Sequence, residues 1–405
     1  MDRSQFADIA VWITGAGLAG RPDTAMLTEF CERVTATGLP LASGIVVIDT
    51  LHPVYEGHAI RWYHDNRETT VQGYGRTSEG EAAENYRRSP FYYLVQSGEP
   101  YLRRRLTPET DTEFTTIDKA RAEGMTDYVA VLNRFAPEGI VGDMDCVFSA
   151  WMTSAPHGFT DDDIESLRRL VPFLALSMKC AALARTAENL VHAYLGRDAG
   201  RMVMSGRIAR GIADRIEAVL WFSDLRGYTR ITDTAPPEQI IPLLNDYADA
   251  VVSAIHEEGG DVLKLMGDGV LAIFRADDRP RACVCALTAA TAAMRSVAEL
   301  NLRRKADGLP TTGMYLGLHI GAVFFGNVGS KDRLDFTVVG PAVNEVSRIA
   351  AMCRSVDQTV LVSAAFAAAL GNAGPRLVSV GRYALRGVGH PQELFTLDPE
   401  AQGTA

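Results

Sequence analysis

The chain has no surplus of basic residues and no block of clustered Lys and Arg. Its 405 residues include 40 Lys and Arg against 50 Asp and Glu, which gives a formal net charge of −10. Affinity for nucleic acids depends on clustered basic side chains that neutralise phosphates. The sequence therefore predicts no nucleic-acid partner.

Cysteine is scarce and scattered. The six cysteines stand at positions 31, 146, 180, 283, 285 and 353. No His or second Cys pair lies at the spacing of a zinc site, and the first residues do not form a signal-peptide pattern. We expect free, mostly buried thiols in a reducing compartment.

Long apolar runs are also missing. No uninterrupted apolar stretch approaches the ~20 residues that cross a bilayer. We therefore expect no membrane span and a cytoplasmic protein. Any signal that it senses is then soluble or delivered by a partner.

The first 158 residues mix helix and strand patterns, with helix-type periodicity at 23–35 and 79–97 and strand-type runs at 42–49, 58–63, 127–133 and 146–153. Such a mixture with short connections predicts an α/β domain of the size of a sensor module. Six ring-bearing side chains could line a ligand pocket, although such residues are also common in cores. They are Trp62, Tyr63, His64, Tyr92, Tyr93 and Trp151.

A long helix is predicted over residues 160–195, and residues 159–211 form the predicted connection to a second domain. Thr160 can cap the helix, and three acidic residues follow at the positive end of its dipole. Apolar residues at 3-4 spacing suit a two-helix interface or a stripe buried within the chain's own domain. They are Ile164, Leu167, Val171, Leu174, Met178 and Ala181. Pro172 lies inside the pattern and is expected to kink the helix.

Residues 212–405 form the predicted second domain. Its strands and helices follow a βαββαβ order, which is ferredoxin-like and places the chain in the α+β class. Asp224 and Asp268 each follow an apolar strand-type run and open into a glycine-containing turn. Carboxylates at strand ends suit Mg²⁺ or Mn²⁺, and pairs of such ions are common in phosphoryl chemistry.

Three sequence blocks surround these aspartates. They are Phe-Ser-Asp-Leu-Arg-Gly-Tyr-Thr at 222–229, Lys-Leu-Met-Gly-Asp-Gly-Val-Leu-Ala-Ile-Phe at 264–274, and Phe-Thr-Val-Val-Gly-Pro-Ala-Val-Asn-Glu-Val-Ser-Arg at 336–348. Together they resemble the catalytic domain of class III adenylyl and guanylyl cyclases. The resemblance implies that Asp224 and Asp268 bind two Mg²⁺ or Mn²⁺ ions per active site. It also implies that Gly227 lets the backbone approach the substrate phosphates.

The same resemblance assigns four further residues. Lys264 and Thr337 match the two positions that read the purine. The pair implies ATP, because Lys can donate to adenine N1 and a Thr hydroxyl can accept from the exocyclic amine. Asn344 and Arg348 match the pair that orients the ribose and stabilises charge on the α-phosphate. They stand four apart on a predicted helix and so share a face.

Two positions depart from the family pattern. Arg386 stands where members often carry a Lys that contacts the terminal phosphates, and its own contact with the triphosphate is left open. Ala322 stands where some members carry an Arg that helps to bind the triphosphate. Within the family the metal aspartates come from one catalytic domain, and the purine and transition-state residues come from its partner. The resemblance therefore implies a head-to-tail homodimer with two equivalent sites.

The first domain resembles a GAF-type sensor at residues 124–132, 146–153 and 158–163. The resemblance implies a signalling helix between sensor and catalyst, and a small-molecule or protein regulator whose identity and sign of effect stay open. The two resemblances together imply an adenylate cyclase that converts ATP to 3′,5′-cyclic AMP and pyrophosphate. The alternatives are a guanylate cyclase and a catalytically inactive, nucleotide-binding regulatory module.

Overall fold

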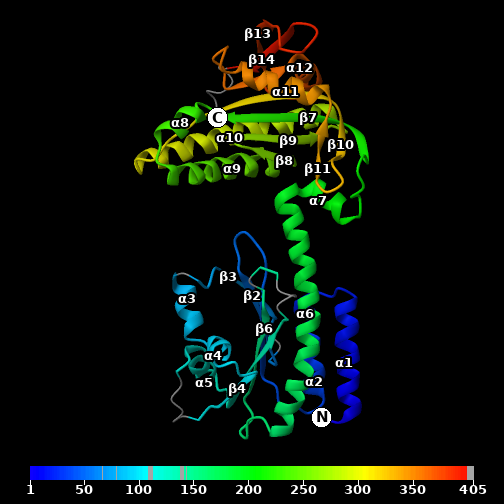
Figure 1. Ribbon diagram of the computed structural model, residues 1–405, viewed down its shortest axis with the longest axis vertical. Coiled ribbons are helices and arrows are strands. Elements are labelled where there is room, and N and C mark those ends of the chain that lie inside the picture. The colour runs from blue at the N-terminus through cyan, green and yellow to red at the C-terminus, as the bar shows by residue number, and fades with distance from the viewer. Residues whose placement is uncertain (66, 79, 108–112, 137–140, 143, 399–405) are drawn as a thin grey trace. The chain divides into compact units, whose positions relative to one another are not determined.

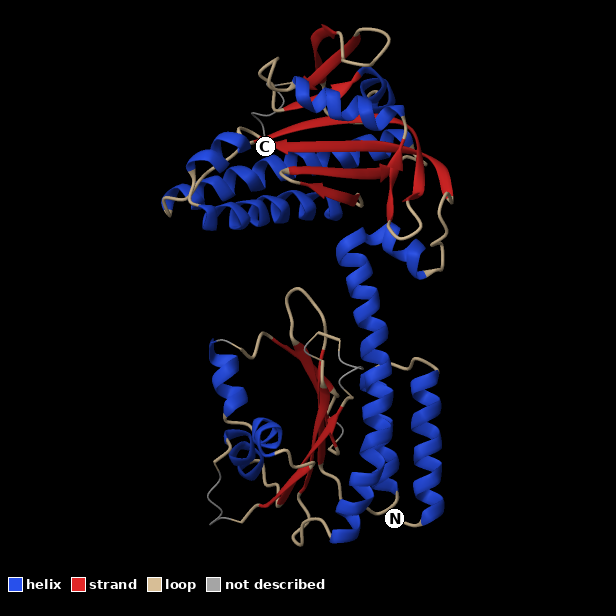
Figure 2. Ribbon diagram, in the orientation of Figure 1, coloured by secondary structure: helices blue, strands red, loops and turns tan. Residues whose placement is uncertain are grey.

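The chain forms two compact units, Met1–Leu190 and Val191–Ala405. The computed structural model describes residues 1–65, 67–78, 80–107, 113–136, 141–142 and 144–398 (Figure 1). Each unit is built on a sheet that carries helices (Figure 2).

The N-terminal unit contains a six-stranded sheet of order β3-β2-β1-β6-β5-β4, in which all neighbours are antiparallel. Its strands are β1 (Ser43–Asp49), β2 (Gly57–Tyr63), β3 (Thr70–Tyr74), β4 (Tyr101–Arg105), β5 (Asp127–Arg134) and β6 (Cys146–Thr153). The four strands expected from the sequence are confirmed. The edge strands β3 and β4 were not expected, because β3 is exposed along most of its length and β4 is rich in Arg.

Helices cover both faces of this sheet (Figure 2). On one face α1 (Arg3–Leu18), α2 (Asp23–Ala36) and α6 (Asp161–Leu195) share a core with Val46 and Trp151. On the other face lie α3 (Gly80–Arg87), α4 (Pro90–Ser97) and α5 (Thr115–Ala122), and Leu94 and Ile117 pack there with Phe148. Side chains on both faces of β5 and β6 are consequently buried.

The single helix expected over 79–97 is wrong, because the chain forms the two helices α3 and α4 there; position 79 lies outside the described residues. The hydroxyl of Ser89 accepts a hydrogen bond from the backbone N–H of Tyr92 at 3.2 Å and caps a new helix. Pro90 fits the first position of that helix, where no N–H is needed. Gly98 ends α4 in the left-handed conformation.

The apolar stripe of α6 packs within its own unit. Ile164, Leu167, Val171, Leu174 and Met178 are all buried in the core that α1 and α2 share with the sheet. The sequence allowed either a two-helix interface or a stripe buried within the chain's own domain. The structure has the second arrangement for these five side chains. Pro172 lies inside α6, which continues to Leu195.

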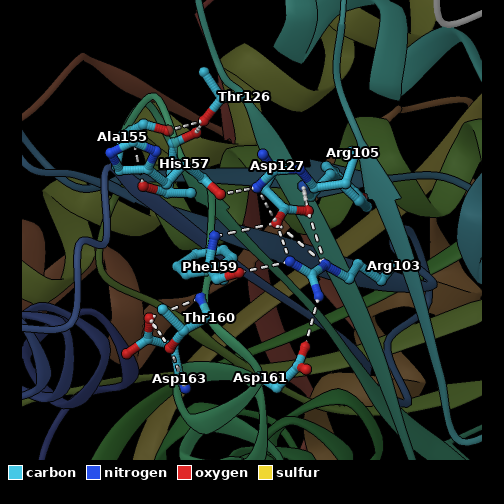
Figure 3. Close-up of polar contacts among 12 residues, drawn as sticks. Arg103, Arg105, Thr126, Asp127, Ala155, His157, Phe159, Thr160, Asp161 and Asp163 are labelled. Atoms are coloured by element: carbon cyan, nitrogen blue, oxygen red, sulfur yellow. Dashed lines mark hydrogen bonds and ion pairs between the residues drawn. The ribbon is translucent and has the colours of Figure 1, made fainter.

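A buried carboxylate ties the start of α6 to the sheet (Figure 3). Asp127, the first residue of β5, is fully buried. It accepts hydrogen bonds from Nη2 of Arg103 at 2.8 Å and from the backbone N–H of Phe159 at 3.1 Å. Arg105 contacts the same carboxylate at 3.3 Å. Arg103 also donates to the carbonyl of Phe159 at 2.6 Å and reaches Asp161, the first residue of α6, at 3.2 Å.

The C-terminal unit contains an eight-stranded sheet of order β13-β14-β12-β10-β7-β9-β8, with β11 paired to β10. Its strands are β7 (Ala213–Leu225), β8 (Asp261–Met266), β9 (Gly269–Arg275), β10 (Met314–Gly329), β11 (Leu334–Val339), β12 (Val360–Ser363), β13 (Leu377–Tyr383) and β14 (Gln392–Leu397). The antiparallel set β10-β7-β9-β8 has the expected βαββαβ connectivity. β10 is a single long strand of 16 residues.

Helices also cover both faces of this sheet. On one face α9 (Ile240–Glu257) and α10 (Arg279–Ala306) pack around Trp221 of β7. On the other, α7 (Arg197–Met204) and α11 (Pro341–Met352) pack on Leu220 and Phe325. Because β7 is covered on both faces, its centre reads as a continuous apolar run. The remaining helices are short: α8 (Tyr228–Thr234), the 3₁₀ helix η2 (Pro237–Gln239) and α12 (Ala364–Leu370).

Two helices, α6 and α10, are long and apolar enough to cross a membrane by length and composition alone. In each, 44% of the apolar window is buried inside the protein, and core helices of soluble proteins pass the same test. No membrane span was expected from the sequence, because neither helix contains an uninterrupted apolar run of about 20 residues. The cysteines are free thiols, of which Cys31, Cys146, Cys283 and Cys353 are buried.

Candidate active site

Asp224 and Asp268 lie together at one end of the C-terminal sheet. Asp224 is at the end of β7, and Asp268 is in the turn between β8 and β9, which pair with each other next to β7. The two carboxyl groups are close enough to interact with each other electrostatically. The backbone N–H of Leu225 donates to Oδ1 of Asp224 at 3.1 Å. Burial, with Asp268 as a further cause, raises the pKa of Asp224 to about 6.

The donor chemistry of this pair fits a divalent cation. Two neighbouring carboxylates repel each other when both are ionised, and a cation between them removes that repulsion. Their hard oxygens suit Mg²⁺ or Mn²⁺. Among the described residues, no group of three or more His, Cys, Asp or Glu is placed to hold a metal ion. Asp224 and Asp268 would therefore supply part of a coordination shell, to be completed by water, backbone or substrate oxygens.

A cavity of about 1220 Å³ surrounds the two aspartates. Four basic side chains line it: Arg226, Arg230, Lys305 and Arg354. The turn that carries Arg226 is held against the chain before β10, because its N–H donates to the carbonyl of Gly313 at 2.8 Å. Carboxylates for cations and basic groups for anions in one cavity suit a metal-bound polyphosphate.

Gly227 also lies in the wall of this cavity. Its φ of 72° is left-handed, and it precedes α8 as the N-cap residue. A Cβ at this position would meet no atom within 4 Å. The glycine is therefore required by the turn conformation and not by crowding.

Lys264 and Thr337 lie on β8 and β11, two strands that do not pair in the sheet but are joined by an ion pair. Lys264 is on β8, and its ammonium group forms an ion pair with the carboxylate of Asp335 on β11. Thr337 follows two residues later on β11, so its side chain points to the same side of the strand as Asp335. Phe336 and Val338, which alternate with them, are buried. The structure thus brings the two predicted purine-reading residues to one surface.

Asn344 and Arg348 are both exposed on α11, one turn apart. Neither lines the cavity around Asp224, although Ser347 of the same helix does. Lys264, Thr337 and Arg386 are absent from its wall as well. The eight predicted site residues of a single chain therefore form separate groups. The metal aspartates and Gly227 share the cavity, and the other five lie outside it.

Sequence reasoning missed three of the basic residues in the cavity wall. Arg230 stands four residues after Arg226 on the chain, and this spacing beside a metal aspartate is a signal that was available. Lys305 is near the end of α10, and Arg354 follows α11. Neither lies in a recognisable motif, so only the folded chain brings them to the aspartates.

The C-terminal unit is similar in sequence to known proteins. The family model "Adenylate and Guanylate cyclase catalytic domain" matches residues 213–398. The adenylate cyclase of Anabaena cylindrica is 35% identical over 157 residues, which cover 38% of this chain and 30% of that protein. Adenylate cyclase 1 of Rhizobium meliloti strain 1021 is 32% identical over 171 residues, which cover 41% of this chain and 25% of that protein.

Solved cyclase structures also match. The crystal structure of the adenylyl cyclase CyaB from P. aeruginosa aligns with 46% of this chain and 96% of that chain, at 23% identity and a TM-score of 0.43. The chain spans less than a third of the length of the two curated relatives. The family match contains all eight predicted site residues, from Asp224 to Arg386. Residues 213–398 are a class III adenylyl/guanylyl cyclase catalytic domain.

Proposed function

We propose that this chain is an adenylate cyclase, which converts ATP to 3′,5′-cyclic AMP and pyrophosphate. The observation that carries the proposal is that Asp224 and Asp268 lie together inside a cavity lined by basic side chains. In the reaction the ribose 3′-oxygen bonds to the α-phosphorus, and the bond from that phosphorus to the bridging oxygen of the β-phosphate breaks. Pyrophosphate leaves with the bonding electrons, and the 3′-hydroxyl proton passes to water.

Asp224 and Asp268 are the residues that would hold Mg²⁺ or Mn²⁺, two ions per site. Bound there, such ions supply Lewis acidity at the phosphates and a lower pKa of the 3′-hydroxyl. The chain's own basic groups bind the triphosphate, and Arg226, Arg230 and Lys305 are placed in the cavity to do so. They also replace the charge that Ala322 does not provide.

Asn344 orients the ribose, and Arg348 stabilises the charge that grows on the α-phosphate. A guanidinium remains protonated at all relevant pH values, so its charge is available without a proton transfer. Neither residue has to be buried before the substrate binds, and both are exposed in the single chain. Arg386 is likewise exposed and available for the terminal phosphates.

The choice of ATP over GTP rests on Lys264 and Thr337. Lys264 can donate to adenine N1, whereas guanine carries a hydrogen at that position and would oppose the ammonium group. Asp335 holds the ammonium near Thr337. A guanylate cyclase is the second candidate, since the matching family includes both activities.

The separation of the site residues supports a head-to-tail homodimer. Five of them lie outside the cavity of the metal aspartates, so a second copy is proposed to bring its own five to that cavity. A two-fold arrangement would then create two equivalent sites. We also propose that the N-terminal unit, a sheet with helices on both faces, is a GAF-like sensor that regulates the catalyst through α6.

A turnover assay tests the activity. The purified chain is supplied with ATP or GTP and with Mg²⁺ or Mn²⁺, and cyclic products are separated by chromatography. Asp268→Ala is expected to lower turnover by about 100-fold or more, because the ions it holds stabilise transition-state charge by several kcal/mol. Asp233→Asn is the matched control, because Asp233 lines the same cavity but belongs to none of the three sequence blocks. Nucleotide binding without any cyclic product would refute the enzyme proposal, and cyclic GMP as main product would refute the choice of ATP.

A mixing experiment tests the shared site. Asp224→Ala and Arg348→Ala chains are each expected to be inactive, because every site in either homodimer lacks one group. After subunit exchange at equal concentrations we expect about a quarter of wild-type turnover, because half of the dimers are hybrids with one intact site each. No recovery, with hybrid dimers verified by native mass spectrometry, would contradict the shared site.

A further inference from the structure

The N-terminal unit contains a cavity that the cyclase chemistry does not use. It has a volume of about 700 Å³ and is lined by residues of β1, β2, β3 and β6 and of α3, α4 and α5. Cavities of this size hold small organic molecules. None of the six ring-bearing residues singled out from the sequence, Trp62, Tyr63, His64, Tyr92, Tyr93 and Trp151, belongs to its wall.

One part of the wall is aromatic. Phe91 and Phe148 lie with their ring centroids 5.0 Å apart, and Tyr86 lies 6.5 Å from Phe148. Tyr74 on β3 completes the aromatic part of the lining. Such rings offer apolar contact area, and their faces carry negative electrostatic potential that attracts cations.

The charged part of the wall is entirely acidic. Asp49, Glu56 and Asp145 line the cavity, and no Lys, Arg or His is found among its described lining residues. By sequence, the positions of this unit outside the described ranges contain no Lys, Arg or His either. These three carboxylates would therefore repel an anionic ligand, such as a nucleotide or a carboxylate.

Neutral donors orient two of these carboxylates. The hydroxyl of Tyr74 donates to Oδ1 of Asp49. The backbone N–H and the hydroxyl of Thr77 donate to the two oxygens of Glu56, each at 2.5 Å. Burial, together with the neighbouring Asp49, raises the pKa of Tyr74, so the phenol stays protonated and keeps donating. These contacts fix the oxygens in position, and each donor is a neutral group.

We propose that this cavity binds a small organic cation, a primary amine or quaternary ammonium attached to an aromatic or apolar body. The rings would contact the body, and the carboxylates would bind the charged group. This combination of an apolar wall with a few oriented polar groups is typical of small-molecule sites. The inference concerns binding by the N-terminal unit and does not depend on whether the C-terminal unit turns over ATP.

Three probes of matched shape and different charge test it on the full chain by isothermal titration calorimetry. They are 2-phenylethylamine, 2-phenylethanol and 3-phenylpropionate, which are cationic, neutral and anionic at pH 7. We expect the amine to bind at least about tenfold more tightly than the alcohol, and the propionate to bind most weakly, because Coulomb interaction is the difference between the three. The proposal is overturned if the alcohol and the amine bind with equal affinity. It is also overturned if no amine binding is detected up to about 10 mM, a concentration at which even a weak specific site would be occupied.

Variants locate the charge. Glu56→Gln and Asp145→Asn keep the size of each side chain and remove one negative charge from the wall. Each is expected to weaken amine binding about fivefold or more while leaving alcohol binding unchanged, since neutral contacts persist. Glu84→Gln is the matched control, an exposed carboxylate on α3 that does not line the cavity. Equal amine affinity in all three variants would overturn the proposed site. If a variant fails to fold, the comparison of the three probes on the wild-type chain still decides the question.

Discussion

Replacing Asp127 by Ala is expected to destabilise the N-terminal unit by about 3 kcal/mol. Removing one partner of a buried ion pair costs about 3–5 kcal/mol. The value belongs at the lower end here, because Arg103 is 27% exposed and keeps its contacts with the carbonyl of Phe159 and with Asp161. The buried N–H of Phe159 loses its acceptor as well, and this loss by itself costs about 1–3 kcal/mol.

Hydrogen–deuterium exchange of the full chain, read by mass spectrometry, measures this loss locally. Peptides over 146–165 should exchange about 100-fold faster in Asp127→Ala, since each 1.4 kcal/mol is a factor of ten. Asp127→Asn should fall between wild type and Ala, because it keeps an oxygen for Phe159 but not the charge. Glu165→Gln is the control. Glu165 is 58% exposed and pairs with Arg168 on the surface of α6, so its effect should stay below about 0.5 kcal/mol. An Asp127→Ala effect no larger than that of the control would refute the reasoning.

Three further perturbations follow from single contacts. Gly158→Ala should lower the urea midpoint of the N-terminal unit, because Gly158 has a φ of +66° and an added Cβ would lie 2.7 Å from Oδ2 of Asp127; an unchanged midpoint would contradict the clash. His319 is buried, and burial lowers its pKa to about 4. Between about pH 6.5 and pH 4 this histidine is protonated in the unfolded chain but not in the folded one. Its contribution to the free energy of unfolding is therefore complete above about pH 6.5 and falls by up to 1.4 kcal/mol per pH unit toward about pH 4. In His319→Asn the urea midpoint should fall less between about pH 6.5 and pH 4 than in the wild-type chain. Urea midpoints that fall equally in both chains would contradict this role of His319. Asp335→Asn should raise the KM for ATP about fivefold with little change in kcat, because it frees Lys264 without touching the reacting atoms; an unchanged KM in a cyclic-AMP assay would remove Asp335 from substrate selection.

The sequence predicted elements whose cause is local. The buried strand β6 and the long helix α6 begin at or within one residue of their expected positions. β6 is a short, mostly apolar run, and α6 has apolar residues at 3-4 spacing with Thr160 before its first residue. Helix α7 was not expected, because its residues lie in a glycine-containing, polar stretch. In the folded chain the buried carboxylate of Asp261 on β8 accepts hydrogen bonds from the backbone N–H groups of Arg197 and Asp198, at 2.9 and 3.2 Å. A cap that comes from another strand leaves no pattern in the helix's own sequence.

The candidate site also contains residues that a local sequence pattern identifies and residues that only tertiary packing brings there. Asp224 and Asp268 were identified because each stands in a sequence block, after a strand-type run and before a glycine-containing turn. Lys305 and Arg354 reach the cavity from the ends of two helices. Their placement depends on how α10 and α11 pack on the sheet, which no short segment encodes. The ion pair between Lys264 and Asp335 also depends on tertiary packing, because it joins two strands that are far apart in the sequence.

The separation of Asp224 and Asp268 from Asn344 and Arg348 on one chain has a consequence for gene dosage. If a complete site requires two copies, the number of sites in dilute solution grows with the square of the chain concentration, so halving expression would cut output about fourfold. A chain damaged in both groups would still pair with intact chains and leave each such pair without a working site. Such an allele would act dominantly, whereas a chain unable to fold would be recessive.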